Sequence, residues 1–159
     1  MSELNPKLHI VTVVAVVRSK DRKYLVLKRH DREKVYPGMF TFPGGKMEGN
    51  ETVDEALSKE VWEEAGLKLK PGKLLLKDKS ILRPDGQTSK SFSYLCEIEG
   101  SDVVKVSRDF TDFRWVSVSD LATLPHVGIE EELLKAEEIY ALGVSVEKLQ
   151  TKSVRAVLQ

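Results

Sequence analysis

The sequence predicts an α/β fold in a single domain, and three observations carry that prediction. Short stretches rich in β-branched residues, bounded by turn residues, predict strands. Residues 53–65 contain neither proline nor glycine and have helix signals at both ends, which predicts a helix among those strands. The length of 159 residues corresponds to one domain, because single domains usually contain about 100–200 residues.

The first half of the chain predicts three strands. Residues 9–17 are dense in valine, isoleucine and threonine and predict a buried strand. A turn at 19–21 separates it from the stretch 23–29, which we expect to be its hairpin partner. After a polar loop, residues 40–42 predict a short strand that stops at the turn residues 43–45.

The second half begins with the clearest helix in the sequence. Thr52 and Glu55 have the spacing of a capping box, and Gly66 stands where a helix ends in a left-handed residue. The later predicted elements are strands at 74–82 and 91–99 joined by the turn 84–86, a strand at 113–118, a helical turn opened by Ser119 and Asp120, and a helix over 129–142 stopped by Gly143. We expect the domain to span 1–143 and residues 144–159 to form a tail or a docked terminal segment.

Composition and charge exclude several classes of protein. The 25 basic residues balance 25 acidic ones and are scattered, so the chain has no general attraction for nucleic acid or an anionic membrane. Cys96 is the only cysteine, which excludes an internal disulfide or a cysteine zinc cluster and fits a reducing compartment. No signal peptide and no run of roughly 18 apolar residues can be recognised. We expect a cytoplasmic protein, monomeric or homodimeric, whose partner is a small molecule.

The predicted helix carries acidic residues on its apolar face. At about 100° per residue, Glu60 and Glu64 share one face with Val53 and Leu57, and Glu63 lies at the edge of that face. Buried carboxylates without partners cost several kcal/mol, and like charges add repulsion. Basic partners, raised pKa values or a bound cation would relieve the conflict. The alternative is that Glu60 pairs with a lysine or arginine while the other two are solvated.

The glycine turn before this helix favours the bound cation. Glycine at 44 and 45 allows backbone groups to approach a ligand, and clustered carboxylates with a free carbonyl suit Mg²⁺. Lys46 follows directly and is able to reach an anion. The pattern is not a P-loop, because Met47 follows the lysine and a second glycine at the required spacing is missing.

At this point the sequence resembles a known family. Gly45, then Glu51 after five residues, then Lys-Glu-Val-Trp-Glu-Glu-Ala-Gly-Leu at 59–67 after seven more, resembles the signature of the Nudix hydrolases. Lys59 stands where that signature has arginine. The flanking stretches 42–46 and 114–117 also resemble the family, and the resemblance covers about residues 8–140. It implies an α/β/α sandwich with a mixed sheet and Mg²⁺-dependent hydrolysis of a nucleoside diphosphate linked to another group, with Mn²⁺ as a substitute cation.

The resemblance also implies roles for individual residues. The metal carboxylates would be Glu60, Glu63 and Glu64, with the carbonyl of Gly44 as a further ligand. Glu51 would help to position the attacking water, and Lys46 and Arg29 are candidates for phosphate contact. Lys59 would orient motif carboxylates less rigidly than the family arginine, since arginine binds carboxylates bidentately and lysine is a point charge.

A general base or further metal ligand is expected outside the motif. Asp109 lies six residues before Trp115, in a loop where antimutator members of the family carry an acidic metal ligand. An ordinary solvated aspartate is the alternative. The rival acidic residues for the role are Asp112, Glu97 and Glu130.

Substrate choice is expected to depend on aromatic side chains. Phe40, Phe42 and Trp115 are candidates for stacking on a base, with packing in the core as the alternative. The stretch 124–128 lacks the asparagine by which antimutator members read an oxidised base. Pro84 resembles a proline of members that act on ADP-ribose, and a turn explains it equally.

The predicted reaction is hydrolysis of a (deoxy)nucleoside triphosphate to the monophosphate and pyrophosphate. Three alternatives stay open: a pyrophosphatase for ADP-ribose or another nucleotide sugar, a non-catalytic nucleotide-binding module, and an isomerase of the same fold. The isomerase would need a cysteine for proton transfer to carbon, and Cys96 is the sole candidate.

Overall fold

The computed structural model describes residues 5–143. Its helices and strands are β1 (Ile10–Arg18), β2 (Tyr24–Arg29), β3 (Phe40–Thr41), β4 (Gly44–Lys46), α1 (Val53–Ala65), β5 (Leu74–Leu82), β6 (Thr88–Glu97), β7 (Phe110–Val116), α2 (Val118–Leu121) and α3 (Glu130–Ala141). The predicted tail at 144–159 lies outside the described residues. Within residues 5–143, no helix is both long and apolar enough to cross a membrane.

The strands form one mixed sheet with the order β3-β2-β1-β6-β5. β1 pairs in parallel with β6 along its whole length, and β5 pairs antiparallel with β6 at the edge. Two strands lie off this path, since β4 pairs with β1 and β7 pairs with β2. The expected hairpin of β1 and β2 is antiparallel, but its register is a single pair, Arg18 with Tyr24. The mixed sheet expected from the resemblance is confirmed.

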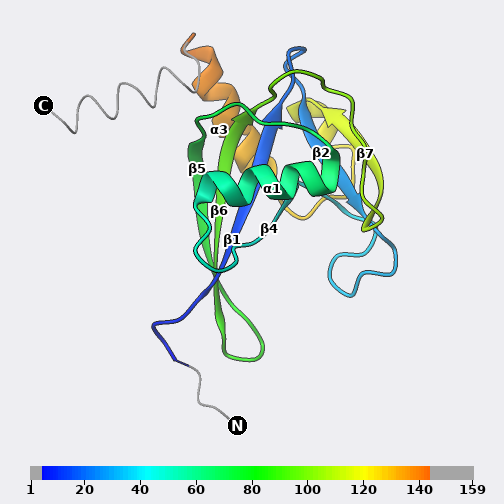
Figure 1. Cartoon of the computed structure of the whole chain (residues 1–159). Coiled ribbons are helices and arrows are strands. Elements are labelled where there is room, and N and C mark those ends of the chain that lie inside the picture. The colour runs from blue at the N-terminus through cyan, green and yellow to red at the C-terminus, as the bar shows by residue number, and fades with distance from the viewer. Residues whose placement is uncertain (1–4, 144–159) are drawn as a thin grey trace, which may run out of the picture.

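Helices cover both faces of the sheet (Figure 1). α1 packs on one face, where Leu57 and Val61 join odd-numbered residues of β1 such as Val13 in a hydrophobic core. α3 packs on the opposite face, where Leu133 joins Val16 and its neighbours in a second core. Side chains alternate between the faces of a strand, so β1 supplies both cores. The α/β/α architecture is therefore observed.

Local signals place α1 at the predicted residues. The Thr52 hydroxyl accepts a hydrogen bond from the Glu55 backbone N–H at 3.1 Å. That hydroxyl also donates to the Glu55 carboxylate at 3.1 Å, so Glu55 meets the side chain of the cap rather than its backbone. Gly66 ends the helix with φ 69°, a conformation that costs glycine little. These caps fix which side chains of α1 face the sheet.

Several element boundaries differ from the prediction. The residues expected to stop a strand, Gly44 and Gly45, instead form β4 against β1. A Cβ on Gly44 would lie 2.4 Å from the Val13 carbonyl oxygen, so glycine permits this close pairing. The strand expected at 113–118 begins earlier, at Phe110. The following helical turn is capped by Ser117, not opened by Ser119 as predicted, because the Ser117 side chain accepts from the Asp120 N–H.

Candidate active site

The candidate site forms where α1 crosses β4. The Gly44 N–H donates a hydrogen bond of 2.9 Å to Oε2 of Glu64. Gly45 lies against Glu60, since a Cβ at this position would come within 2.5 Å of the Glu60 carboxyl carbon. Any other residue at 45 would displace that carboxylate. The two glycines thus bring the chain close to both carboxylates that the sequence placed on the apolar face.

Lys59 lies near three acidic side chains, those of Glu48, Glu51 and Glu60. Its Nζ is 2.8 Å from Glu51, 3.8 Å from Glu48 and 4.0 Å from Glu60. Glu51 also accepts a 2.8 Å hydrogen bond from the Glu48 backbone N–H. Lys59 therefore pairs with Glu51 most closely, and as a point charge it reaches the other two carboxylates only at the limit of an ion pair.

Burial and repulsion act on the carboxylates that Lys59 does not neutralise. Burial, opposed by the Gly44 hydrogen bond and assisted by Glu60, raises the pKa of Glu64 to about 8. Burial and the charge of Glu63 raise the pKa of Glu60. The opposite holds for Glu51, where the Lys59 hydrogen bond lowers the pKa. Two electrostatic environments thus adjoin at α1. Lys59 compensates the charge of Glu51, whereas Glu64 has no cation near it within the described residues.

The loop before β7 brings Asp109 toward these carboxylates. The N–H groups of Lys105 and Ser107 donate to the last carbonyls of α1, at Ala65 and Glu64, with distances of 2.9 and 3.0 Å. These bonds satisfy helix-end acceptors and anchor the loop. The exposed Asp109 is close enough for its charge to raise the pKa of Glu64.

The rival acidic residues have other surroundings. Asp112 lies 3.7 Å from Arg114, and Glu130 lies 3.0 Å from His126. Glu97 lines a cavity with Arg18 and Lys70. Asp109 is therefore the predicted loop residue that shares an electrostatic environment with Glu64.

The residues present fit a divalent cation. Within residues 5–143, no three histidine, cysteine or acidic side chains already converge as a metal cage. Glu60 nevertheless raises the pKa of Glu64, Glu63 raises the pKa of Glu60, and no ion pair to Glu64 occurs in the described part of the chain. Carboxylate oxygens are the ligands that Mg²⁺ prefers, and a cation would favour the ionised form of both. The roles of Glu60, Glu63 and Glu64 as metal carboxylates stay a prediction.

The two residues predicted to contact phosphate, Lys46 and Arg29, have different surroundings. Lys46 is exposed at the end of β4, next to Gly45. Arg29 ends β2 and is engaged, because its Nε donates to the Val35 carbonyl at 2.9 Å and its guanidinium lies 3.4 Å from Glu33. Its backbone pairs with Phe110, beside Asp109.

A cavity beside Asp109 is the feature that sequence reasoning missed. It measures about 480 Å³ and is lined by His30, Arg32, Glu33, Lys34, Val35, Arg108 and Asp109. The charged loop 30–34, which carries Arg32 and Lys34, was the available signal, but only the fold brings that loop against Arg108. The His30 N–H donates to the Asp109 carbonyl at 3.3 Å and joins the two loops.

The candidate aromatic side chains are largely buried. Phe40 and Phe42 are 3% and 4% exposed and belong to the core on the α3 face. Trp115 is partly buried on the α1 face. Packing in the core, the alternative weighed from the sequence, therefore describes the two phenylalanines in this structure, and base stacking stays a prediction.

The positions of Cys96 and Pro84 bear on two further alternatives, the isomerase and the ADP-ribose pyrophosphatase. Cys96 is wholly buried in the core, and burial raises its thiol pKa to about 12, which does not suit proton transfer to a substrate. Pro84 occupies a tight turn closed by the Gly86 N–H and the Arg83 carbonyl, at 2.9 Å. The turn explains the proline.

Comparison with known proteins agrees with the family resemblance seen in the sequence. The family model of the NUDIX domain matches residues 8–136. Nucleoside triphosphatase NudI of Escherichia fergusonii is 29% identical over 119 residues, covering 70% of this chain and 84% of that protein. The protein of the same name from Escherichia coli O139:H28 is 30% identical over 119 residues, covering 69% and 84%.

Solved structures share the fold. The MutT NUDIX hydrolase of Burkholderia pseudomallei is 25% identical with a TM-score of 0.66, covering 80% of this chain and 98% of that one. The NUDIX domain of Shewanella oneidensis NrtR, solved with ADP ribose, has a TM-score of 0.68 at 17% identity, covering 86% and 94%. At that identity the second likeness concerns the fold alone.

Proposed function

This chain belongs to the NUDIX family and is a pyrophosphohydrolase, and from that premise we propose that it converts a (deoxy)nucleoside triphosphate to the monophosphate and pyrophosphate with Mg²⁺. The observation that carries the proposal is the pair Glu60 and Glu64, held against Gly45 and Gly44. Burial raises the pKa of both carboxylates, and repulsion adds to it, from Glu63 at Glu60 and from Glu60 at Glu64. Such a pair is costly to the fold unless a cation or a proton compensates it.

The residues take distinct roles in this proposal. Glu60, Glu63 and Glu64, with the carbonyl of Gly44, would hold the cation, which when bound neutralises phosphate charge and lowers the pKa of water. Glu51 would orient the attacking water, and Lys59 keeps Glu51 ionised through their 2.8 Å ion pair. Asp109 would take the proton of that water or complete the cation's ligands.

Three features support a triphosphate as the substrate. Relatives about 30% identical over most of their length are named nucleoside triphosphatases. The cavity beside Asp109 is lined by Arg32, Lys34 and Arg108, which suit a chain of phosphates. Lys46, exposed next to Gly45, adds a further positive charge.

A substrate panel tests the proposal. The full chain is assayed with Mg²⁺ or Mn²⁺ against ribo- and deoxynucleoside triphosphates, ADP-ribose, dinucleoside polyphosphates and sugar nucleotides, with products identified by mass. We expect a triphosphate to be preferred, with pyrophosphate as a product. Preference for ADP-ribose would replace the triphosphate by the alternative substrate class. Absence of phosphate-containing products from every compound would contradict catalysis.

A further inference from the structure

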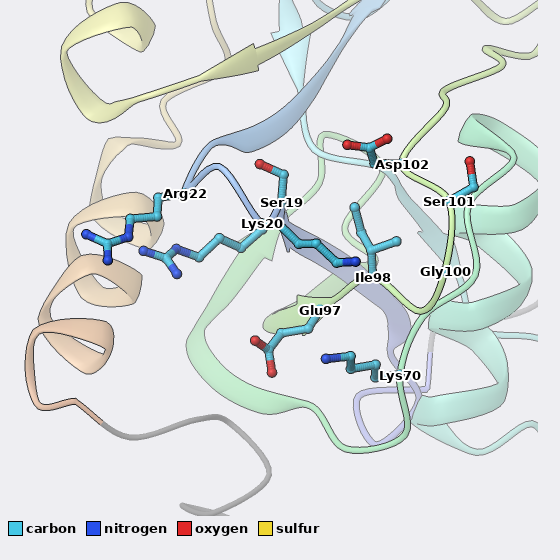
Figure 2. Close-up of a pocket in the computed structure, with 10 residues that line it drawn as sticks. Ser19, Lys20, Arg22, Lys70, Glu97, Ile98, Gly100, Ser101 and Asp102 are labelled. Atoms are coloured by element: carbon cyan, nitrogen blue, oxygen red, sulfur yellow. The ribbon is translucent and has the colours of Figure 1, made fainter.

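A second polar cleft, drawn in Figure 2, lies where β1 ends at Arg18 and in the turn that follows. The glycines of β4 pair with β1 earlier along that strand, at residues 13 and 14. We call this second cleft the turn cleft: a cavity of about 270 Å³ whose charged lining is Arg18, Lys20, Arg22, Lys70, Glu97 and Asp102. A neighbouring cavity of about 570 Å³ shares Arg18, Arg22 and Glu97 with it and reaches Tyr140 on α3. The two cavities are neighbours through these three shared residues, near the turn that joins β1 to β2.

The turn cleft carries an excess of positive charge. Its lining has four cations and two carboxylates, and counting Glu137, 3.9 Å from Arg18, still leaves a surplus of one. Among residues 5–143, Lys20, Arg22 and Lys70 form no ion pair within 4.0 Å. Uncompensated cations around a cavity favour an anionic ligand.

Arg22 is held in an unfavourable backbone conformation at the rim. Its φ is 62°, in the left-handed region that side chains rarely adopt. Its N–H bonds to the Ser19 carbonyl at 3.1 Å, and the Ser19 N–H bonds to the Lys23 carbonyl at 2.8 Å.

The hairpin between β5 and β6 shows what such a turn ordinarily uses. There the Gly86 N–H bonds to the Arg83 carbonyl at 2.9 Å, and the Arg83 N–H bonds to the Gln87 carbonyl at 3.0 Å. The hydrogen-bond pattern is the same, and the left-handed position, with φ 83°, is glycine. Arginine at the equivalent position is therefore a cost to the fold, and strain of this kind is retained chiefly where a side chain has a function.

Arg18 adds a buried donor to the same surface. Its guanidinium stacks on the Tyr140 ring, 3.5 Å from the ring centroid, and its Nε is buried with no hydrogen-bond partner in the described part of the chain. The Tyr140 hydroxyl is likewise buried and unpaired among those residues. Unpaired buried donors are uncommon in native folds and call for a ligand or water.

The turn cleft is separate from the candidate active site. Arg18 lies four residues beyond Val14, the partner of Gly44, which is about 13 Å along the strand. Val13 and Val17 face α1, whereas Val16 packs with the α3 core, so Arg18 and its Tyr140 contact lie on the α3 side. A ligand of the turn cleft would not occupy the place of the substrate.

We propose that the turn cleft is a binding site for a phosphate group, either free or carried by a small nucleotide. The surplus of positive charge in the cleft favours an anion such as phosphate, and guanidinium groups bind phosphate oxygens in a planar, bidentate way. The Ser19 and Ser101 side chains, which also line the cleft, supply neutral donors.

The test is a titration followed by amide NMR on the full ¹⁵N-labelled chain. Inorganic phosphate is added at constant ionic strength in the presence of EDTA, so that no divalent cation supports binding at the candidate active site. Pyrophosphate and a nucleoside monophosphate form separate arms and distinguish free phosphate from a nucleotide. We expect saturable shifts at residues 19–22 and 100–102.

Variants make the titration decisive. Arg22→Gly should weaken phosphate binding about tenfold or more, yet raise the Tm by roughly 2–4 °C, because glycine removes the backbone strain. Lys70→Gln should also weaken binding. Lys7→Gln, which removes one charge near the start of β1, is the matched control and should leave the affinity unchanged.

The opposite results would overturn the proposal. These are an absence of saturable shifts at 19–22 and 100–102, shifts confined to β4 and α1, or unchanged phosphate affinity in Arg22→Gly. None of these readouts uses turnover or a metal, so failure of the turn cleft and failure of the proposed hydrolysis are distinguished.

Discussion

Two glutamates on opposite faces of the sheet show how a buried carboxylate becomes structural or functional. Glu132 on α3 is 1% exposed, and one of its oxygens lies 3.5 Å from the Lys79 ammonium on β5. Glu64 on α1 has a backbone N–H as its hydrogen-bond partner, and among the described residues it has no cation within 4.0 Å. Within the described residues, the chain thus supplies a cation to the buried Glu132 and none to the partly buried Glu64.

The difference teaches that burial alone does not identify a site. A carboxylate paired with a lysine contributes to packing between helix and sheet, and breaking such a pair costs stability. A carboxylate surrounded by Glu60, Glu63 and Asp109 has a raised pKa and is a candidate for binding a cation. Exchanging each glutamate for glutamine separates the two cases.

The largest expected effect is on activity at α1. Glu64→Gln and Glu63→Gln should each lower kcat about 100-fold or more, roughly 2.7 kcal/mol in the barrier, because each removes charge that would hold the cation. Unfolding curves of both variants should show unchanged or increased stability, since repulsion is relieved. Glu132→Gln is the matched control and should do the reverse, with kcat little changed and a lower Tm. Near-full activity in both α1 variants would contradict the metal-carboxylate roles.

The next largest expected effect is at Asp109, a loop residue whose charge helps to raise the pKa of Glu64. Asp109→Asn should lower kcat about tenfold or more and change KM less, because the cation and Lys46 would still bind the phosphates. Asp112→Asn, at the residue paired with Arg114, is the control. Loss of a base should shift the acidic limb of the pH–rate profile, whereas loss of a metal ligand should be partly rescued by Mg²⁺. If Asp109→Asn leaves kcat unchanged while Glu51→Gln abolishes activity, the loop takes no part in the reaction and the catalytic residues lie wholly within the motif.

A third prediction uses the pH dependence of stability. The pKa of Glu64 is raised from 4.5 to about 8 in the folded protein, so between these values the folded state binds more protons than the unfolded state. The metal-free protein should therefore lose stability as pH rises through this window, by up to about 1.4 kcal/mol per pH unit from this group.

Chemical unfolding at several pH values checks this prediction. The difference between the native protein and Glu64→Gln isolates the contribution of Glu64, and the variant should show a flatter profile. Mg²⁺ should stabilise the native protein most at the alkaline end, where Glu64 is ionised. Equal slopes for both proteins would mean that Glu64 does not titrate in this window.

The smallest expected effect concerns Lys59. Lys59→Arg should leave kcat equal or higher, within about threefold, and Mg²⁺ activation equal or tighter, because a planar guanidinium is able to hold two carboxylate oxygens. Steady-state kinetics across Mg²⁺ concentrations measure both quantities. A large loss of activity would show that the compact ammonium has a role of its own, such as direct contact with phosphate.

Local chemistry explains why α1 was predictable to the residue. The Thr52 cap and the left-handed Gly66 act within one turn of the helix, so spacing in the sequence is sufficient to place both ends. The helical period of about 100° per residue likewise predicted that Glu60 and Glu64 share one face of α1. By contrast, Gly44 and Gly45 look like turn residues locally, and their pairing with β1 depends on a strand more than 25 residues earlier in the chain.

The sequence by itself therefore determined the helix, its acidic face and the family signature, because each depends on residues within a few turns or at fixed spacing. Tertiary structure decided which charges are compensated. Lys59 pairs with Glu51 and Lys79 pairs with Glu132, and spacing alone specifies neither pair. Only folding brings Asp109 close enough to raise the pKa of Glu64, and only folding places Arg22 and Lys70 at one cleft. Electrostatic effects depend on distance and burial, and packing across the sheet sets both.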